Sequence, residues 1–464
     1  MPHALCFFRR RRRTVCGIFG IYNHPEAANL TYLGLYSLQH RGQESAGIVS
    51  SDGNRLYQYR QMGLVAEIFT RDTLKKLPGR NAIGHVRYST AGSSDIKNAQ
   101  PFAVDYAKGS MSIAHNGNLV NASFIRSQLE ADGSIFQSTS DTEVIVHLIA
   151  RSKKKTFLER TLESLQKVEG AYSFVFLTEE ELVAVRDPHG FRPLVIGQLK
   201  DAPVVASETC ALDLINARFI REIEPGEVVV FHKKGMDSYK PFPKARQTPC
   251  IFEFIYFARP DSFIFDRNVY EVRRSLGVQL AKESPAKAEM VIPIPDSGFP
   301  ATIGYAFESK LPLEMGMIRN HYVGRTFIEP EQSIRHFGVK IKLNPVRELL
   351  DRKKIVTVDD SIVRATTSQK INKMFRNAGT KEIHVRISSP PITHPCFFGI
   401  DTPAKSELIA SSHAVKEIQK YIGANSLCYL SLEGLKKCVE WDPDQFCYAC
   451  FTGDYPVPFA MDMD

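Results

Sequence analysis

The pattern of apolar residues changes near residue 245, and this change constrains the fold more than any other feature of the chain. Residues 16–245 contain many short apolar runs broken by Gly, Asn, Ser and Asp, which is typical of β-strands. We expect two helices there, around 30–38 and 141–149. In residues 246–464, strand-like runs alternate with helical segments, which predicts an α/β domain with a parallel sheet and helices on both faces. Pro241, Phe242 and Pro243 mark the linker.

The same patterns predict individual elements. In the first part, the expected strands are 17–22, 82–86, 111–114, 172–177 and 182–185. In the second part, the expected strands are 289–293, 354–358 and 381–387, and the expected helices are 270–282, 366–377 and 414–422.

Charge and composition exclude several classes of protein. The net charge of +8 would suggest nucleic-acid binding, but five charges come from Arg9 to Arg13, and the rest of the chain carries only +3. We interpret this run as part of a removable leader and expect no nucleic-acid partner. The 43% hydrophobic and 24% charged content is typical of a globular protein, and 464 residues suggest two or three domains at about 150 residues each.

The sequence also predicts a location. No apolar run approaches the ~18 residues that cross a membrane, and the leader lacks the apolar core of a secretory signal. Nine cysteines without a regular framework are not typical of a secreted disulfide scaffold. We therefore expect a cytoplasmic protein without a membrane partner. An organelle remains the alternative, because the leader is rich in arginine and free of acidic residues.

Cys16 follows this leader and opens an apolar segment. If residues 1–15 are removed as a propeptide, Cys16 carries both a thiol nucleophile and a free α-amine. An α-amine has a pKa of about 8, so it can act as the base that activates its own side chain. The alternative interpretation is a structural cysteine buried at the start of a strand.

Four further positions could assist a thiol that attacks an amide. Arg87 could bind a carboxylate, and Asp141 could bind an ammonium group or cap the helix that follows it. Asn116 and Gly117 offer a side-chain amide and an unhindered backbone N–H, the two donors of an oxyanion hole. Asn-Gly is also a common turn signal.

These positions lie in segments that resemble the class II glutamine amidotransferases: 16–20 (CGIFG), 38–47 (LQHRGQESAG), 84–90 (GHVRYST), 115–117 (HNG) and 140–142 (SDT). The resemblance implies an N-terminal-nucleophile hydrolase with an αββα domain that releases ammonia from glutamine. It implies catalytic roles for Cys16, Asn116 and Gly117, and glutamine binding by Arg87, Thr90 and Asp141. It also implies that residues 1–15 are a propeptide and that the domain spans 16–245.

The second part contains a strand that ends in two acidic residues, Asp359 and Asp360, followed by a turn and a helix within 354–368 (KIVTVDDSIVRATTS). In such folds ligands bind at the carboxyl ends of strands, and a helix N-terminus attracts anions. The two carboxylates could hold ribose hydroxyl groups or Mg²⁺. A solvated acidic turn that caps the helix is the alternative.

This segment resembles the 5-phosphoribosyl-1-pyrophosphate (PRPP) loop of the type I phosphoribosyltransferases, and 293–298 (PIPDSG) and 320–328 (NHYVGRTFI) resemble their pyrophosphate and mobile loops. The family commonly has Gly where this chain has Ala365, and a left-handed alanine would cost about 1 kcal/mol. The resemblance implies PRPP binding by Asp359, Asp360, Ser361, Arg364, Ala365, Thr366, Thr367 and Arg325. It implies Mg²⁺ binding by Ser297, Asp359 and Asp360.

Together the two parts resemble the amidophosphoribosyltransferase family. This implies that glutamine, PRPP and water give 5-phosphoribosylamine, glutamate and pyrophosphate, the first committed step of purine biosynthesis. Ammonia would pass between the sites through an internal channel. The resemblance also implies a homotetramer or homodimer with feedback by purine nucleotides. Two alternatives are a non-catalytic sensor of PRPP or nucleotides, and an amidotransferase that serves another phosphoribosyl acceptor.

The remaining motif is Cys447-Tyr448-Ala449-Cys450, with Cys250 and Cys396 far upstream. Four thiolates suit Zn²⁺ or an iron–sulfur cluster, and spacing alone does not separate them. The segments 248–262, 394–401 and 450–453 resemble the iron–sulfur branch of the family. The resemblance implies one [4Fe–4S] cluster per chain on Cys250, Cys396, Cys447 and Cys450, in a domain that spans 246–464.

Overall fold

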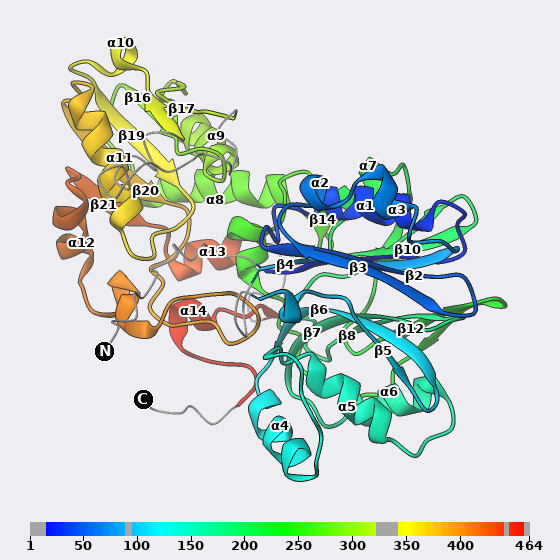
Figure 1. The fold of residues 1–464 in the computed structure, drawn as a ribbon. Coiled ribbons are helices and arrows are strands. Elements are labelled where there is room, and N and C mark those ends of the chain that lie inside the picture. The colour runs from blue at the N-terminus through cyan, green and yellow to red at the C-terminus, as the bar shows by residue number, and fades with distance from the viewer. Residues whose placement is uncertain (1–14, 89–94, 322–341, 440–444, 459–464) are drawn as a thin grey trace, which may run out of the picture.

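The computed structural model describes residues 15–88, 95–321, 342–439 and 445–458 (Figure 1). The first part contains two antiparallel sheets that lie face to face (Figure 1). In spatial order, the seven-stranded sheet consists of β11 (Arg218–Glu222), β9 (Val195–Leu199), β10 (Ala202–Ala206), β1 (Gly17–Ile21), β4 (Asn81–Arg87), β2 (Ser45–Ser51) and β3 (Leu56–Met62). The six-stranded sheet consists of β13 (Gly235–Tyr239), β12 (Val228–His232), β8 (Leu182–Arg186), β7 (Gly170–Leu177), β6 (Gly109–Leu119) and β5 (Phe102–Tyr106).

Apolar side chains from both sheets meet in one core, for example Ile18 and Ile83 from one sheet and Ala114 and Val175 from the other. Such strands have hydrophobic residues on both faces because helices cover the outer faces as well. Outside the seven-stranded sheet lie α1 (Ala27–Ser37), α2 (Val65–Ile68), α3 (Arg71–Leu74) and α7 (Cys210–Leu214). Outside the six-stranded sheet lie α4 (Ala122–Ala131), α5 (Glu143–Arg151) and α6 (Phe157–Leu165). The predicted αββα arrangement is confirmed.

The expectation of only two helices in this part is wrong. The two expected helices are α1 and α5, but α4 and α6 are additional helices of 10 and 9 residues. The start of α6 carries a sequence signal that periodicity missed, a capping box in which Thr156 accepts a hydrogen bond from the Glu159 N–H. Helix α4 buries only three residues, so its apolar stripe is short.

The second part contains a four-stranded parallel sheet in the order β16 (Met290–Pro293), β19 (Lys354–Asp359), β20 (Glu382–Ile387) and β21 (Ser426–Tyr429). Neighbouring residues of β19 point to opposite faces. Val356 packs in a core with α8 (Val269–Glu283) and α9 (Phe299–Ser309), whereas Ile355 packs in a core with α11 (Thr366–Asn377) and α12 (Val415–Ile422). Helices therefore cover both faces, as predicted.

Shorter elements complete the second part. They are the π-helical turn η2 (Glu253–Phe257), the strand pairs β14 (Phe263–Ile264) with β15 (Arg267–Asn268) and β17 (Met317–Arg319) with β18 (Leu343–Pro345), and the helices α10 (Arg347–Leu350), α13 (Leu432–Cys438) and α14 (Ala449–Thr452). Single 3₁₀ turns lie at Lys405–Glu407 and Ile409–Ser411 in this part and at Ile96–Asn98 in the first part.

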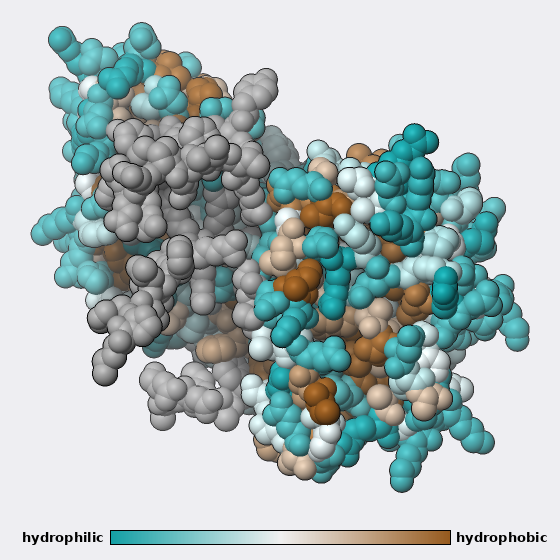
Figure 2. Space-filling model, viewed as in Figure 1, coloured by the Kyte–Doolittle hydropathy of each residue, from teal (hydrophilic) through white to brown (hydrophobic). Residues whose placement is uncertain are grey.

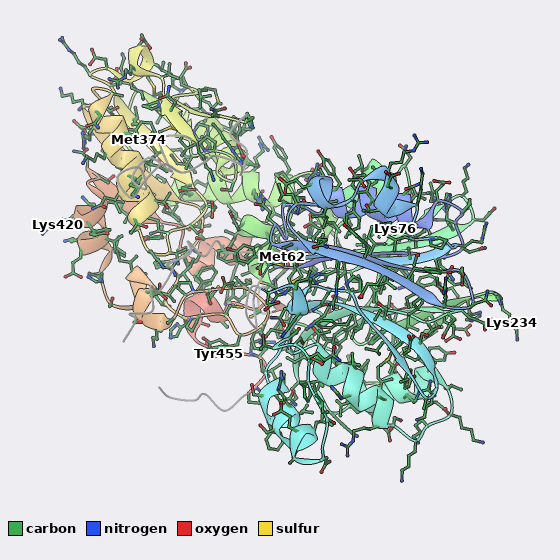
Figure 3. The ribbon with its side chains drawn as sticks, viewed as in Figure 1. Met62, Lys76, Lys234, Met374, Lys420 and Tyr455 are labelled. Carbon is green, nitrogen blue, oxygen red and sulfur yellow. The ribbon has the colours of Figure 1, made fainter. Side chains whose placement is uncertain are left out.

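The two parts meet through the segments on either side of η2 and through the C-terminal segment. Tyr455 lies at this junction (Figure 3), where its hydroxyl group donates to the Pro395 carbonyl at 2.8 Å and its ring contacts Phe397. The coloured residues on the face in Figure 2 are mostly hydrophilic, with apolar residues in separate groups. Within the described part of the chain, no helix combines the length and apolar character needed to cross a membrane.

Candidate active sites

Cys16 lies directly before β1, and its side chain is buried beside the end of β4. The Cys16 Sγ is 3.8 Å from the Tyr88 carbonyl oxygen. Burial raises the pKa of the Cys16 thiol above its ordinary value, although the positive charges of Arg87 and Arg41 oppose the rise. The thiol therefore stays protonated at neutral pH, and a reaction at this sulfur requires a base.

Asn116 and Gly117 lie inside β6, so the interpretation of Asn-Gly as a turn is wrong. Asn116 is fully buried, and neither its side-chain oxygen nor its nitrogen has a hydrogen-bond partner among the described residues. Unpaired buried amides are rare because each lost hydrogen bond costs free energy. At Gly117, where φ is +151°, a Cβ atom would lie 2.0 Å from the Ala171 carbonyl oxygen. The position therefore requires glycine, and the unpaired amide beside it is available to a ligand.

Arg87 and Asp141 lie close enough to Cys16 for their charges to change its pKa. Arg87 ends β4, is almost fully buried and forms an ion pair with Glu44 at 3.3 Å. The carboxylate of Asp141 accepts a hydrogen bond from the Leu119 N–H at 2.9 Å, which ties it to the end of β6. Asp141 does not cap α5, because Thr142 occupies the cap position. A cation and an anion thus flank the thiol, as binding of a glutamine zwitterion requires.

Two buried histidines join the sheets beneath this site. The Nε2 of His85 in β4 lies 3.0 Å from the carbonyl oxygen of His115 in β6, and the Nδ1 of His115 lies 3.0 Å from the Thr142 hydroxyl group. Burial lowers the pKa of both rings, to about 3 for His85, so both are neutral. The structure thus places Arg87 and Asp141 near Cys16, and Asn116 and Gly117 lie in β6 between His115 and Leu119, which both contact Asp141. Thr90 lies outside the described residues.

Sequence reasoning assigned no role to Glu44, His85 or Arg41. All three lie in segments that were singled out, but their partners are distant in sequence. The backbone carbonyl of Cys16, for example, accepts a hydrogen bond from the Arg41 Nε at 2.9 Å. No local spacing rule predicts such a contact, because it depends on how the strands pair.

The second candidate site lies at the carboxyl end of β19. The hydroxyl groups of Ser297 and Ser361 both donate to the Asp360 carboxylate at 2.5 Å. Burial, followed by the negative charge of Asp360, raises the pKa of Asp359 well above its ordinary value. Two carboxylates held this close favour a bound cation or hydroxyl donors between them. Ser297, Asp359 and Asp360 offer the oxygen ligands that Mg²⁺ uses together with substrate phosphates.

The turn after these acids leads into α11 with the geometry of an anion site. Ala365 adopts the left-handed conformation at φ +58°, directly before the helix. Thr366 and Thr367 form the exposed first turn of α11, where backbone N–H groups have no helical partner. Arg364 forms an ion pair with Glu407 at 2.7 Å. Arg325 lies outside the described residues.

The four predicted cluster cysteines lie near one another at the junction of the two parts. Cys250 and Cys447 are paired in a short parallel bridge, and the Cys450 carbonyl accepts hydrogen bonds from the Thr393 and His394 N–H groups. The charge of a Cys396 thiolate raises the pKa of both the Cys250 and the Cys447 thiols, so Cys396 lies near them. Burial is the main cause that raises the pKa of Cys250 to about 11, while the nearby Arg192 guanidinium opposes the rise.

The donor set fits an iron–sulfur cluster, because thiolates are its ligands and Arg192 supplies a positive charge beside them. The fit concerns the residue types and not their present arrangement, because across the described ranges no three His, Cys, Asp or Glu side chains are grouped closely enough to hold a metal ion. Cys210, which is not one of the four, is buried beside Glu208.

Comparisons with known proteins agree with this geometry. Residues 85–214 match the family of glutamine amidotransferase domains. The chain is 56% identical to amidophosphoribosyltransferase 1 of Arabidopsis thaliana, a chloroplastic protein, over 96% of this chain and 79% of the relative. It is 51% identical to the amidophosphoribosyltransferase of Bacillus subtilis, over 96% of this chain and 95% of the relative.

Solved structures give the same result over the whole fold. One similar structure is the glutamine PRPP amidotransferase of B. subtilis in complex with ADP and GMP, with a TM-score of 0.92 at 50% identity, covering 96% of this chain and 98% of that one. Another, described as an allosteric regulatory enzyme of purine biosynthesis, has a TM-score of 0.93 at 51% identity and covers 96% and 97%.

Proposed function

The chain belongs to the amidophosphoribosyltransferase family, and we propose that it transfers the amide nitrogen of glutamine to PRPP in purine biosynthesis. The products are 5-phosphoribosylamine, glutamate and pyrophosphate. The observation that carries this proposal is the unpaired amide of Asn116, which lies beside a glycine-only position in a site that also contains a buried thiol and two opposite charges.

In the first half-reaction, the Cys16 Sγ attacks the side-chain carbonyl carbon of glutamine. Arg87 binds the substrate carboxylate and Asp141 binds its ammonium group. The Asn116 amide and the Gly117 N–H donate to the oxyanion that forms, and the absence of other described partners leaves the Asn116 amide ready to do so. The α-amine of Cys16, free after removal of residues 1–15, takes the thiol proton and passes it to the departing ammonia. Water then hydrolyses the thioester to glutamate.

In the second half-reaction, ammonia attacks the C1 of PRPP and pyrophosphate leaves. Thr366 and Thr367 place the N-terminus of α11 against the 5-phosphate. Asp359 and Asp360 bind the ribose hydroxyl groups or, with Ser297, a Mg²⁺ ion that would neutralise the leaving pyrophosphate. From the resemblance to this family we also propose that Ser361, Arg364, Ala365 and Arg325 bind PRPP. We further propose a closed channel for ammonia, feedback by purine nucleotides and a homo-oligomer.

We also propose that Cys250, Cys396, Cys447 and Cys450 hold one [4Fe–4S] cluster. Their thiolates are the ligands, and the cluster would tie the C-terminal segment to the core rather than take part in either reaction. The purified protein should be brown with about four irons per chain, as four cysteine ligands imply. Colourless protein with one zinc per chain would overturn this assignment. A cytoplasmic location is proposed as well, with a plastid as the alternative because several relatives are described as chloroplastic.

The substitution Cys16→Ala tests whether glutamine hydrolysis and PRPP amination occur at separate sites. We expect loss of glutamine-dependent synthesis and retention of synthesis from high concentrations of ammonia, because the thiol and the PRPP site lie in different domains. Mass spectrometry of the wild-type N-terminus checks that Cys16 is the first residue. Glutaminase activity in Cys16→Ala would show that another residue is the nucleophile.

A further inference from the structure

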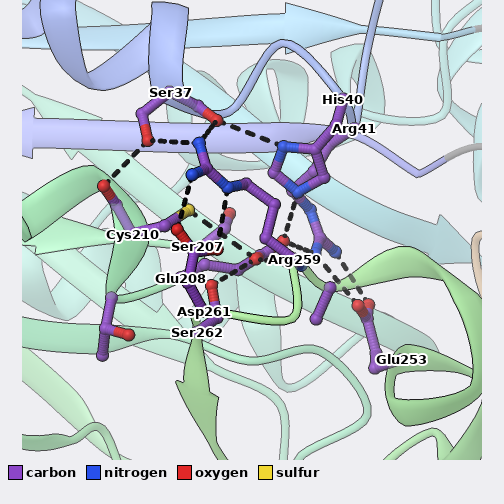
Figure 4. A network of polar contacts seen from close by, with 12 residues as sticks. Ser37, His40, Arg41, Ser207, Glu208, Cys210, Glu253, Arg259, Asp261 and Ser262 are labelled. Atoms are coloured by element: carbon purple, nitrogen blue, oxygen red, sulfur yellow. Dashed lines mark hydrogen bonds and ion pairs between the residues drawn. The ribbon is translucent and has the colours of Figure 1, made fainter. Parts of the chain in front are cut away.

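A network of buried charged side chains connects the first candidate site to the second domain, and Figure 4 shows three of its members, Arg41, Glu208 and Glu253. It contains two arginines and two glutamates, whose side chains have no exposed area: Arg41, Arg192, Glu208 and Glu253. Two positive and two negative charges balance in this network. Burial of charge is unfavourable unless each group is paired, so the four side chains depend on one another for their positions.

Arg41 is the member that contacts the proposed nucleophile. Its Nε donates to the backbone carbonyl of Cys16 at 2.9 Å. Its two Nη atoms donate to both carboxylate oxygens of Glu253, at 2.9 and 2.7 Å, in a bidentate arrangement that fixes the plane of the guanidinium. The direction of the Nε–H bond, and with it the position of Cys16, therefore depends on Glu253.

Glu253 belongs to the second domain, where it begins the π-helical turn η2. It also accepts a hydrogen bond from the Arg192 Nη1 at 2.9 Å, and Arg192 in turn donates to the Phe398 carbonyl. The second carboxylate, Glu208, accepts from Arg41 and His40 in the first domain and from the Ser262 hydroxyl and the Arg259 N–H in the second. The contacts of Arg41 are thus completed by residues on both sides of the junction.

We propose that Glu253 is a positioning residue for glutamine hydrolysis. It acts through Arg41 to hold Cys16 in line with the oxyanion donors Asn116 and Gly117. The first active site is consequently complete only when the second domain is docked, so that ammonia is released where an acceptor domain is present. This inference rests on the proposed function of Cys16.

The test compares Glu253→Gln with the wild type. The variant keeps the shape of the side chain and removes its charge, so Arg41 loses its bidentate partner. Because displacement of a reacting group by about 1 Å can cost about 100-fold in rate, we expect the kcat for glutamine to fall by about 10- to 100-fold. The KM for glutamine should stay within about twofold, since Arg87 and Asp141 bind the substrate ends. Ammonia-dependent synthesis and metal content should match the wild type.

Glu222→Gln is the matched control. Glu222 is also a largely buried glutamate at the junction, paired with Arg186 at 3.1 Å and bonded to the Phe265 N–H of the second domain, but among the described residues these contacts do not lead to Cys16. Both variants should be less stable than the wild type, and only Glu253→Gln should lower the glutamine-dependent kcat. Rates are compared for the fraction of each protein whose N-terminus is Cys16.

A second variant keeps the inference testable if Glu253→Gln folds poorly. Arg41→Lys retains the charge but loses the fork that contacts both Cys16 and Glu253. Arg41→Lys should reproduce the kcat loss, and the double variant should be no slower than the worse single variant, because both changes break one path. The inference would be overturned if the kcat losses of the two single variants added fully in the double variant, or if Glu253→Gln kept the wild-type kcat for glutamine. Absence of glutaminase activity in the wild type would instead overturn the proposed function.

Discussion

Replacement of Asn116 by leucine should separate catalysis from stability. The amide is fully buried and both of its polar atoms lack a partner among the described residues. A buried polar group without a partner costs about 1–3 kcal/mol. Leucine has nearly the same shape and removes both polar atoms, so the free energy of unfolding without glutamine should rise by about 1 kcal/mol or more.

The same substitution removes one of the two proposed oxyanion donors. Loss of one such donor costs about 10²–10³ in kcat, or about 2.7–4 kcal/mol of transition-state stabilisation. We therefore expect the glutaminase rate to fall by that factor while the Tm rises, by about 2–4 °C for each kcal/mol in a domain of this size. The assay is glutamate release, together with thermal unfolding in glutamine-free buffer.

Asn98→Leu provides the comparison. Asn98 is equally buried, but its amide donates to the Thr139 hydroxyl group and accepts from the Thr139 N–H, both at 2.9 Å. Its replacement should lower the Tm, because Thr139 loses its partner. An Asn116→Leu protein that is destabilised as much as Asn98→Leu would show that Asn116 is a paired structural residue, and the oxyanion argument would fail.

Three further substitutions test separate parts of the account. Gly399→Ala should lower glutamine-dependent synthesis more than ammonia-dependent synthesis, because a Cβ at φ +95° would lie 2.8 Å from the Cα of Gly117; equal losses in the two rates would contradict this. Asp359→Asn should impair synthesis from both glutamine and ammonia, because it weakens the contact with ribose or metal. If the PRPP KM and kcat of this variant match the wild type, Asp359 belongs to an acidic turn without a role in binding. His85→Gln should flatten the decline of Tm with falling pH. The folded-state pKa of His85 is lowered to about 3, so protonation below about 6.5 favours the unfolded chain in the wild type. Parallel Tm–pH curves for both proteins would refute that reasoning.

Much of the fold follows from local patterns. The helix expected at 366–377 is α11 with the same bounds, and the apolar runs at 82–86 and 172–177 lie in β4 and β7. These elements were predictable because their apolar residues keep the spacing of one type of secondary structure from the start of the element to its end. Helix α4 was missed because its apolar stripe is short, and α6 was missed because the capping box at its start was not considered.

The candidate sites were predictable to a different extent. The motif positions Cys16, Arg87 and Asp141 could be named because each type of side chain has a role in amide hydrolysis. The contacts that hold them could not, since Arg41 meets Glu253 across 212 positions of sequence. Similarly, only strand pairing shows that Asn116 lies in a strand interior rather than in a turn.

The central claim is that one chain couples glutamine hydrolysis to the displacement of pyrophosphate from PRPP. The most direct measurement follows glutamate and pyrophosphate released by the purified protein in the presence of glutamine, PRPP and Mg²⁺. The account predicts that both products appear in equal amounts and that pyrophosphate release requires either glutamine or added ammonia. Release of glutamate with no pyrophosphate, or of neither product from correctly processed protein, would contradict it.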